Sequence, residues 1–381
     1  MNIVHLCVSN FYIDRYAYQE NELVAQNVKD GHQVTVIAST ESFNESRKLT
    51  YLQPADYIGA DGARVIRLPY RRFLPQKIMR KLRVHPGIYH LLTELAPDVI
   101  LFHGTCGWEL NTTARYRRAK GKVKLYVDSH EDFNNSARTW SSKWLLHSPY
   151  YKPILKRNLD AIEAILCVNV AAMDFVGGFY GVPKSKLEFF PLGGKIFSDA
   201  EYESIRNATR VKFGILNDDI LFVQSGKMDA SKKLIESLTA FSQAGGANFR
   251  FLLVGSLQDD IEAEALALIG KDPRIRFEGW KTPDELRNLL CAADVYVQPG
   301  SQSATMQMSL CCRCAVILDD VPSHRPFLDD NGWLVGTTLS LAQAFAAATS
   351  DVRRLPQMAQ QSAEVASRLL DYKSLARRLY R

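Results

Sequence analysis

The sequence predicts an α/β protein made of two tandem Rossmann-like domains that face a cleft between them, each a doubly wound parallel sheet. Short apolar runs alternate with helix-length segments along the 381 residues, the order expected when helices cross over between parallel strands. This pattern stops in a polar stretch near the middle and then restarts, and the length also favours two domains. With 46% hydrophobic and 23% charged residues, the composition excludes disordered and fibrous classes.

Strands in the first half are expected where short runs are apolar on both faces, as strands covered by helices on each side are. The helix expected over Ala17–Asp30 ends before Gly31, because a left-handed helix cap suits glycine. The expected strands are Ile3–Val8, Val34–Ser39, Val65–Leu68, Val99–His103, Val123–Asp128, Ala164–Val168 and Leu187–Pro191.

The second half repeats the pattern, with core spacing in its helices. Strands are expected over Ile220–Gln224, Phe251–Val254, Ile275–Glu278, Val295–Gln298 and Ala315–Leu318, and helices over Lys233–Ser242, Asp260–Ile269, Pro283–Ala292 and Ser303–Cys312. We therefore expect a first domain over residues 1–195 and a second over 196–356. The helix expected over 357–381 has no later element to pack against, so we expect it to fold back on the first domain.

Positive charge is concentrated in the first half. Residues 1–200 carry 26 basic and 19 acidic side chains, whereas residues 201–381 carry 21 and 22. Eight of the basic residues fall between Arg64 and Arg83 with no acid among them, and six more between Arg115 and Lys124. The alternatives are a solvated surface and an anionic partner such as a membrane surface. Nucleic acid is not expected, since no zinc-finger, basic-zipper or RNA-binding signature accompanies the charge.

Composition also predicts the compartment. The first residues lack the basic start and long apolar core of an export signal, and no apolar run is long enough to span a membrane. The seven cysteines are therefore expected as reduced thiols in a cytoplasmic protein. No metal site is expected, because paired Cys and His spacing is absent.

A first candidate phosphate site opens the second half. The strand over Ile220–Gln224 runs into Gly226 and Lys227, and a second lysine, Lys232, stands at the next helix start. A glycine lets the backbone approach a ligand, and two ammonium groups beside a helix N-terminus suit a diphosphate. Surface lysines at a turn are the alternative, but the carboxyl end of a strand favours a binding role.

A second candidate follows the strand over Val295–Gln298. A Pro-Gly turn leads into Ser303, Ala304 and Thr305, which open a helix whose first N–H groups can bind an anion; Ser and Thr also serve there as caps. A dinucleotide cofactor is not expected, because the loop Ser9–Tyr18 contains no glycine.

With these motifs in order, the chain resembles the GT-B-fold glycosyltransferases, and most of all the retaining family-4 group (glycosyl transferases group 1) of bacterial surface polysaccharide synthesis. The first domain has the sequence Gly-His-Gln-Val-Thr-Val over 31–36, and the second has Gly226-Lys227 followed by Lys232. The resemblance continues in order, over nearly the whole chain, at Phe251–Gly255, Ile275–Gly279, Ala293–Pro299 and Asn331–Val335.

The resemblance implies an enzyme that transfers a sugar, with retention, from a UDP- or GDP-sugar to an acceptor hydroxyl, without a metal ion or other cofactor. Lys227 and Lys232 would bind the diphosphate and stabilise the leaving group, next to Gly226 and the 303–305 turn. Trp280 and Lys281 would lie near the nucleotide base.

In the first domain, the resemblance places His130 beside the donor sugar, within the segment Val127–Asp132. A packed core histidine is the alternative. Glu131 and Asp132 are candidate bases by position only. The acceptor is expected to be a saccharide or a lipid-linked saccharide, bound on the basic first domain, which would contact the inner face of the plasma membrane peripherally.

The sequence departs from the family where two glutamates usually stand. Gly300 and Met308 occupy those positions, with Gln302 and Gln307 nearby but out of register. Donor binding must therefore differ there or be lost. Two further functions stay open: a GT-B-fold nucleotide-sugar epimerase or hydrolase, and a degenerate, non-catalytic partner subunit.

Overall fold

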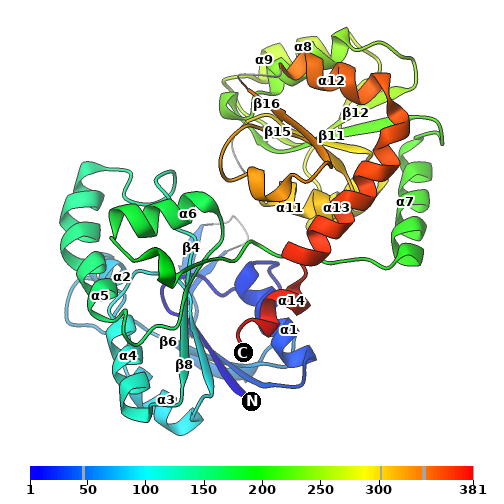
Figure 1. Cartoon of the computed structure of the whole chain (residues 1–381). Coiled ribbons are helices and arrows are strands. Elements are labelled where there is room, and N and C mark those ends of the chain that lie inside the picture. The colour runs from blue at the N-terminus through cyan, green and yellow to red at the C-terminus, as the bar shows by residue number, and fades with distance from the viewer. Residues whose placement is uncertain (45–47, 301–302, 337–339, 381) are drawn as a thin grey trace. The chain divides into compact units, whose positions relative to one another are not determined.

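The computed structural model describes residues 1–44, 48–300, 303–336 and 340–380. The chain divides into two compact units. Unit 1 comprises Met1–Pro191 together with the C-terminal segment from Tyr372, and unit 2 comprises Leu192–Asp371. Each unit holds a parallel sheet with helices on both faces (Figure 1), which confirms the expected α/β class.

The sheet of unit 1 has the strand order β10-β9-β8-β7-β1-β2-β6-β5. All neighbours pair in parallel except β5, which is antiparallel to β6 at the edge. A separate hairpin joins β3 and β4. The strands are β1 (Asn2–Cys7), β2 (Gln33–Ser39), β3 (Glu41–Phe43), β4 (Leu49–Tyr51), β5 (Ala55–Ile58), β6 (Arg64–Leu68), β7 (Val99–Phe102), β8 (Lys124–Ser129), β9 (Ile165–Cys167) and β10 (Leu187–Phe189).

Helices pack on both faces of this sheet because its central strands are buried and apolar on both sides. The C-terminal α14 packs beside α1, and α3, α4 and α5 form another layer (Figure 1). The helices are α1 (Gln19–Lys29), α2 (Gln76–Leu82), α3 (Ile88–Leu95), α4 (Glu109–Lys120), α5 (Lys152–Arg157), α6 (Val170–Asp174) and α14 (Tyr372–Arg377), with π-helical segments η1 (Ser142–Tyr151) and η2 (Phe175–Phe179).

The sheet of unit 2 is wholly parallel, in the order β13-β12-β11-β14-β15-β16. Helices α8, α9 and α12 cover one face, and α11 and α13 lie on the other (Figure 1). The strands are β11 (Ile220–Met228), β12 (Phe249–Leu257), β13 (Ile275–Phe277), β14 (Val295–Gln298), β15 (Ala315–Asp319) and β16 (Gly332–Val335). The helices are α7 (Asp199–Phe213), α8 (Leu234–Gln243), α9 (Glu262–Ile269), α10 (Pro283–Ala292), α11 (Ala304–Cys311), α12 (Leu341–Ser350) and α13 (Leu355–Leu369).

Each sheet has a topological switch point, where successive strands are added first on one side of the initial strand and then on the other. In unit 1 the switch lies between β1 and β7, and in unit 2 between β11 and β14. Loops diverge at the carboxyl ends of such strand pairs and leave a crevice, which is the usual ligand site of doubly wound sheets. These two edges are therefore the expected ligand sites of the two units.

The single helix expected over 357–381 is wrong, because the structure breaks it between α13 and α14. At the break, Asp371 forms a parallel bridge with Gly194, whose N–H donates to the Leu370 carbonyl oxygen (2.8 Å). This tertiary pairing ends α13 within unit 2 and lets α14 belong to unit 1.

Helix α7 was not expected in the polar segment that precedes β11. It begins where the Ser198 hydroxyl accepts from the Glu201 N–H and ends at Gly214, whose φ is 66°. Its Arg206 and Arg210 bind Asp294 at the start of β14, so the segment is part of the fold of unit 2. Among the described residues, no helix combines the length and apolar composition needed to cross a membrane.

Candidate functional site

Two glycines open the backbone at the carboxyl end of β11 in unit 2. Gly226 and Gly255 are register partners on β11 and β12, with φ values of 136° and 138°. A Cβ at Gly255 would lie 1.8 Å from the Gly226 carbonyl oxygen. A side chain is therefore excluded by space at Gly255 and disfavoured by the positive φ at Gly226, which leaves the backbone before Lys227 accessible to a ligand.

The two candidate phosphate segments meet at this switch point. A Cβ on Gly300, after β14, would lie 2.2 Å from the Ser231 carbonyl oxygen. Gln224 on β11 donates from Nε2 to the Lys232 carbonyl oxygen (2.9 Å) and so holds the same loop. The structure thus brings the Lys232 loop against the Gly300 turn, two segments that lie far apart in the sequence.

The two lysines differ in environment. Lys227 is exposed, whereas Lys232 is half-buried. Burial lowers the pKa of the Lys232 ammonium, and nearby Asp229 opposes that change. A half-buried ammonium has weaker competition from water, so its attraction to a phosphate is stronger than that of an exposed one.

The start of α11 has N–H groups that Ser303 does not cap. Its hydroxyl donates instead to Gln298 Oε1 (2.6 Å), and no side chain caps the helix at this residue. Ala304 is exposed and Thr305 is half-buried in the first turn. Ser301 and Gln302 lie outside the described residues.

At the positions of the usual glutamates, the structure has a close backbone approach at Gly300 and a half-buried Met308. The neighbouring Gln307 is buried, and its Oε1 has no hydrogen-bond partner. No carboxylate is present at these positions to accept a hydroxyl donor.

The 279–281 loop lies beside the end of β12, because the Gly255 N–H donates to the Gly279 carbonyl oxygen (2.9 Å). Trp280 is 60% exposed. Lys281 Nζ lies 3.5 Å from Glu278 Oε2. The exposed indole provides a flat apolar surface of the kind on which a base can stack.

In unit 1, His130 follows β8 and is half-buried. Its Nε2 lies 3.8 Å from Asp128 Oδ2 and 3.9 Å from Glu20 Oε1. Burial by itself would lower the pKa of His130, but Asp128, Glu20 and Glu131 raise it to about 9. These carboxylates therefore favour the imidazolium form of the ring at neutral pH.

A buried polar chain runs from Asp128 to the C-terminal segment. His103 Nδ1 donates to Asp128 Oδ2, and His103 Nε2 lies 3.0 Å from His5 Nδ1. His5 Nε2 lies 2.8 Å from Asn27 Oδ1, and Asn27 Nδ2 donates to the Tyr380 hydroxyl (2.6 Å). We call Asp128, His103, His5, Asn27 and Tyr380 the buried polar chain.

The hydrogen-bond directions along the buried polar chain indicate which nitrogens of His5 and His103 carry protons. Tyr380 donates to Asp30 (3.2 Å) and accepts from Asn27, so the Asn27 oxygen accepts from the His5 Nε2–H. The His5 Nδ1 lone pair then accepts from His103 Nε2–H. Because His103 also donates from Nδ1 to Asp128, both its nitrogens carry protons, and the ring is cationic.

The pKa directions agree with this assignment. Burial, and then the neighbouring cation, lower the pKa of His5 to about 3. Burial also opposes charge on His103, but Cys7 and Asp128 raise its pKa well above the ordinary value. Asp128 is buried, yet His103 and then His130 hold the pKa of its carboxyl below the ordinary value. The sequence offered a signal for this arrangement, since His103 and Asp128 end two apolar strands, but no motif marked it.

Glu131 and Asp132 are occupied by structural hydrogen bonds. Glu131 accepts from the Ser129 hydroxyl (2.7 Å) and the Thr105 N–H (3.2 Å). Asp132 Oδ1 accepts from two backbone N–H groups of its own turn. These bonds fix the loop after β8.

In the part of the chain that the structure describes, no group of three or more His, Cys, Asp or Glu side chains could hold a metal ion. All seven cysteines are buried free thiols.

Family models match both halves of the chain. Residues 21–193 match the model described as Glycosyltransferase Family 4, and residues 218–353 match the model described as Glycosyl transferases group 1. Two Rossmann-like units with these matches define a glycosyltransferase of the GT-B fold. The chain belongs to the family-4, group 1 glycosyltransferases.

Solved structures share this fold at low identity. HepE of Anabaena in complex with UDP is 13% identical, with a TM-score of 0.64 over 100% of this chain and 98% of that chain. Sucrose-phosphate synthase from Thermosynechococcus elongatus is 14% identical, with a TM-score of 0.64 over 100% and 97%. WaaG, described as a glycosyltransferase involved in lipopolysaccharide biosynthesis, is 14% identical, with a TM-score of 0.59 over 98% and 98%. No functionally curated protein matches the sequence.

Proposed function

We propose that this glycosyltransferase is a retaining, metal-independent hexosyltransferase. It transfers the sugar of a UDP- or GDP-sugar to an acceptor hydroxyl in bacterial surface polysaccharide assembly, such as O-antigen or capsule. The observation that carries the donor assignment is the contact of the Lys232 loop with the Gly300 turn at the switch point of unit 2. HepE, a protein of the same fold, has been solved with UDP and with UDP-glucose.

In this proposal the diphosphate lies between Lys227, Lys232 and the first turn of α11, with Gly226 allowing close approach. The two ammonium groups neutralise charge that develops on the departing nucleotide diphosphate, which is the work a metal ion would otherwise do. Backbone N–H groups near Ala304 and Thr305 add fixed dipoles aimed at the same anion.

Trp280 and Lys281 are assigned to the nucleotide base and its surroundings. The exposed indole provides the stacking surface, and Lys281 is held by Glu278. In the family that the chain resembles, the second of the two usual glutamates holds the nucleotide ribose. Because Met308 stands at that position and offers no carboxylate, we expect weaker discrimination at the ribose.

His130 is assigned to the donor sugar as a cation. Its imidazolium is stabilised by Asp128 and Glu20 and can donate a hydrogen bond to a sugar or phosphate oxygen near the reacting centre. We assign no general base, because Glu131 and Asp132 are engaged with their own loop.

The test is calorimetric titration of the full chain with UDP and GDP. Lys227→Ala with Lys232→Ala should weaken binding of the preferred diphosphate by roughly tenfold or more, as expected for lost charge-assisted hydrogen bonds. The matched control is Lys271→Ala, an exposed lysine of the same unit. Unchanged affinity in the double variant contradicts the diphosphate assignment.

Product analysis separates the remaining candidates. A nucleotide-sugar epimerase or hydrolase would turn over donor without any acceptor, whereas a transferase needs the acceptor. The replacement of both glutamates, by Gly300 and Met308, favours the degenerate partner subunit as the second candidate. Failure to bind either nucleotide would support that candidate and exclude both enzyme functions.

The acceptor is proposed to be lipid-linked, with the enzyme bound peripherally to an anionic membrane on its cytoplasmic side. Two neighbouring segments of unit 1 support this, because Tyr150 of η1 donates to the Leu82 carbonyl oxygen of α2 (2.9 Å). Exposed apolar side chains stand on or next to both segments, among them Phe73, Ile78, Trp140, Trp144 and Leu145.

Cations accompany these apolar groups, including Arg71, Arg72 and Lys143. Aromatic side chains beside basic ones suit the interface of an anionic bilayer. Replacing Trp144 and Leu145 by Ser should reduce cosedimentation with phosphatidylglycerol vesicles without changing UDP affinity. Equal sedimentation of both proteins rejects the membrane proposal.

A further inference from the structure

An open cavity of about 1380 Å³ lies at the switch point of unit 1. Its walls come from the loop after β1, the loop after β7, the segment after β8 and helix α2. Ser9 on the first loop donates to the Cys106 carbonyl oxygen on the second, so the floor of the cavity is tied together. Of the candidate site residues from the sequence, His130 and Glu131 line it, together with cations of the basic segment Arg64–Arg83.

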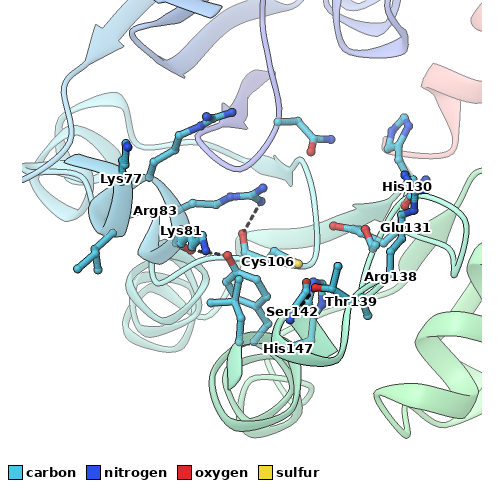
Figure 2. A pocket seen from close by; sticks show the side chains of 18 of the residues that line it. Lys77, Lys81, Arg83, Cys106, His130, Glu131, Arg138, Thr139, Ser142 and His147 are labelled. Atoms are coloured by element: carbon cyan, nitrogen blue, oxygen red, sulfur yellow. Dashed lines mark hydrogen bonds between the residues drawn. The ribbon is translucent and has the colours of Figure 1, made fainter. Parts of the chain in front are cut away.

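The lining is strongly cationic. It contains five Lys or Arg side chains and one carboxylate, and the cations are Lys77, Arg80, Lys81, Arg83 and Arg138. Figure 2 shows Lys77, Lys81 and Arg83 on one side of the cavity and His130, Glu131 and Arg138 on the other.

The charges are not cancelled within the protein. Glu131, the one carboxylate of the lining, contributes a single negative charge against five positive ones. Arg80 pairs with Glu41 (2.9 Å). In the part of the chain that the structure describes, no acidic group forms an ion pair with the other four cations.

Arg83 is directed into the cavity by its backbone. It follows α2 in the left-handed conformation, with φ of 54°, and its N–H closes the helix on the Met79 carbonyl oxygen. Its guanidinium donates to the Cys106 carbonyl oxygen (3.3 Å) and lies 5.9 Å from the Tyr151 ring (Figure 2). A guanidinium has five N–H donors, and Cys106 is its one hydrogen-bond acceptor among the described residues.

Opposite Arg83, the cavity presents an unsatisfied buried donor. His130 Nε2 is buried and has no hydrogen-bond partner. The Nε2–H of this imidazolium has no acceptor, because the two neighbouring carboxylates lie beyond hydrogen-bond distance. We already assign this N–H to the donor sugar, so an anion in the cavity is bound by its Lys and Arg side chains.

We propose that this cavity binds the phosphate or diphosphate group of a phosphorylated saccharide acceptor. The inference rests on the proposed transferase function and adds the chemical class of the acceptor. Several like charges around one cavity repel each other, and a multiply charged anion removes that repulsion while accepting from Arg83. A neutral saccharide would leave these cations without a counterion. The cavity also contains Phe11, Tyr51 and Tyr151, which offer apolar faces to a sugar ring.

The test measures binding of inorganic diphosphate to the full chain by calorimetry, with UDP present at saturation to occupy unit 2. The cavity variant is Lys81→Gln with Arg138→Gln, and it avoids Arg83, whose loss could disturb the end of α2. The matched control is Lys120→Gln with Lys122→Gln, two exposed lysines of the same unit. Thermal unfolding checks that both variants are folded.

We expect the cavity variant to bind diphosphate roughly tenfold more weakly than the control, the loss expected for charge-assisted contacts to phosphate. Equal affinity in the two variants overturns the proposal. The outcome is separable from the donor assignment, because UDP affinity is measured first on the same samples. If UDP fails to bind, only the donor assignment is rejected. The comparison of the two variants then still tests whether the cavity binds diphosphate.

Two further probes distinguish the source of the phosphate group. Competition by glucose 1-phosphate in solution supports a soluble phosphorylated sugar, and competition by farnesyl diphosphate in neutral vesicles supports a lipid diphosphate. Phosphatidylglycerol vesicles are the third competitor. If they compete as strongly as the phosphorylated ligands, and the competition depends equally on Lys81 and Arg138, the cavity is part of a general membrane-binding surface and the proposal is overturned.

Discussion

Replacing Asp128 by asparagine tests the cationic state of His103 inside unit 1. Asp128 is 2% exposed, and its two oxygens accept from His103 Nδ1–H and from the Gly104 N–H (2.7 Å). The substituted amide would have the same shape as the carboxylate, with one acceptor and one donor group. Its NH₂ would then face the His103 N–H, so His103 must lose that proton or the contact must break.

The size of the effect follows from burial. Removing one partner of a buried ion pair costs about 3–5 kcal/mol when the other charge remains. If His103 releases its proton, the substituted amide can donate to the free Nδ1, and the loss falls to about 1–2 kcal/mol, the difference between charge-assisted and neutral hydrogen bonds.

The pH dependence has a definite sign. In the native chain the pKa of His103 is raised, so its contribution to stability is complete below the unfolded pKa of about 6.5 and is lost as pH rises through the folded value. In the Asp128→Asn variant, burial without the carboxylate lowers that pKa, so the variant loses stability as pH falls below about 6.5, by up to about 1.4 kcal/mol per pH unit. The difference between the two proteins should therefore be larger at pH 5.5 than at pH 8.

The assay is urea-dependent hydrogen exchange of peptides that cover β7 and β8, at pH 5.5 and pH 8 with exchange times corrected for pH. Asp174→Asn, an exposed carboxylate of the same unit, is the matched control. A difference in the free energy of unfolding that is the same at both pH values would refute a charged His103.

Three further predictions concern a close backbone contact and buried hydrogen bonds. Gly300→Ala should weaken UDP binding by about tenfold or more and cost about 1–3 kcal/mol of stability, because its Cβ would meet the Ser231 carbonyl oxygen at 2.2 Å. Calorimetry measures the UDP affinity and thermal unfolding measures the stability. If neither value changes, the contact between Gly300 and Ser231 is contradicted. Tyr380→Phe should cost about 1 kcal/mol, because Asn27 and Asp30 lose their hydrogen bonds to the hydroxyl. Faster hydrogen exchange in α1 would show the loss, and unchanged exchange counts against it. Arg210→Met should destabilise unit 2 by about 3–5 kcal/mol, since Asp294 and buried carbonyl groups lose their donor; a loss below about 1 kcal/mol in urea denaturation would show that Arg206 suffices.

Several elements were predictable because their signals are local. Helix α10 begins and ends as expected, since Thr282 and Glu285 form a capping box and Pro283 stands at the first helical position. Strand β14 likewise matches its apolar run, Val295–Gln298. By contrast, the break between α13 and α14 depends on the pairing of Gly194 with Asp371, which no local pattern near residue 370 indicates.

The two phosphate segments were likewise recognisable one at a time. Gly226 and the lysines after it, and the turn after β14, each carry the residues that an anion site requires. Their contact through Gly300 and Ser231 depends on β11 and β14 being neighbours in the sheet. The identity of each strand's neighbour is a property of the whole sheet, so the sequence predicted the segments and not their meeting.

The sequence by itself determined the α/β class, most of the central strands, helices such as α10, and the family, since periodicity, caps and ordered motifs are local properties of the chain. Only the tertiary structure decided which groups raise the pKa of His103 and of His130, and which side chains form the cationic cavity around Arg83. A pKa and a net local charge depend on which groups lie within a few ångströms in a low-dielectric interior. His5, Asp128 and Tyr380 lie far apart in the sequence, and the fold alone brings them into one chain of hydrogen bonds.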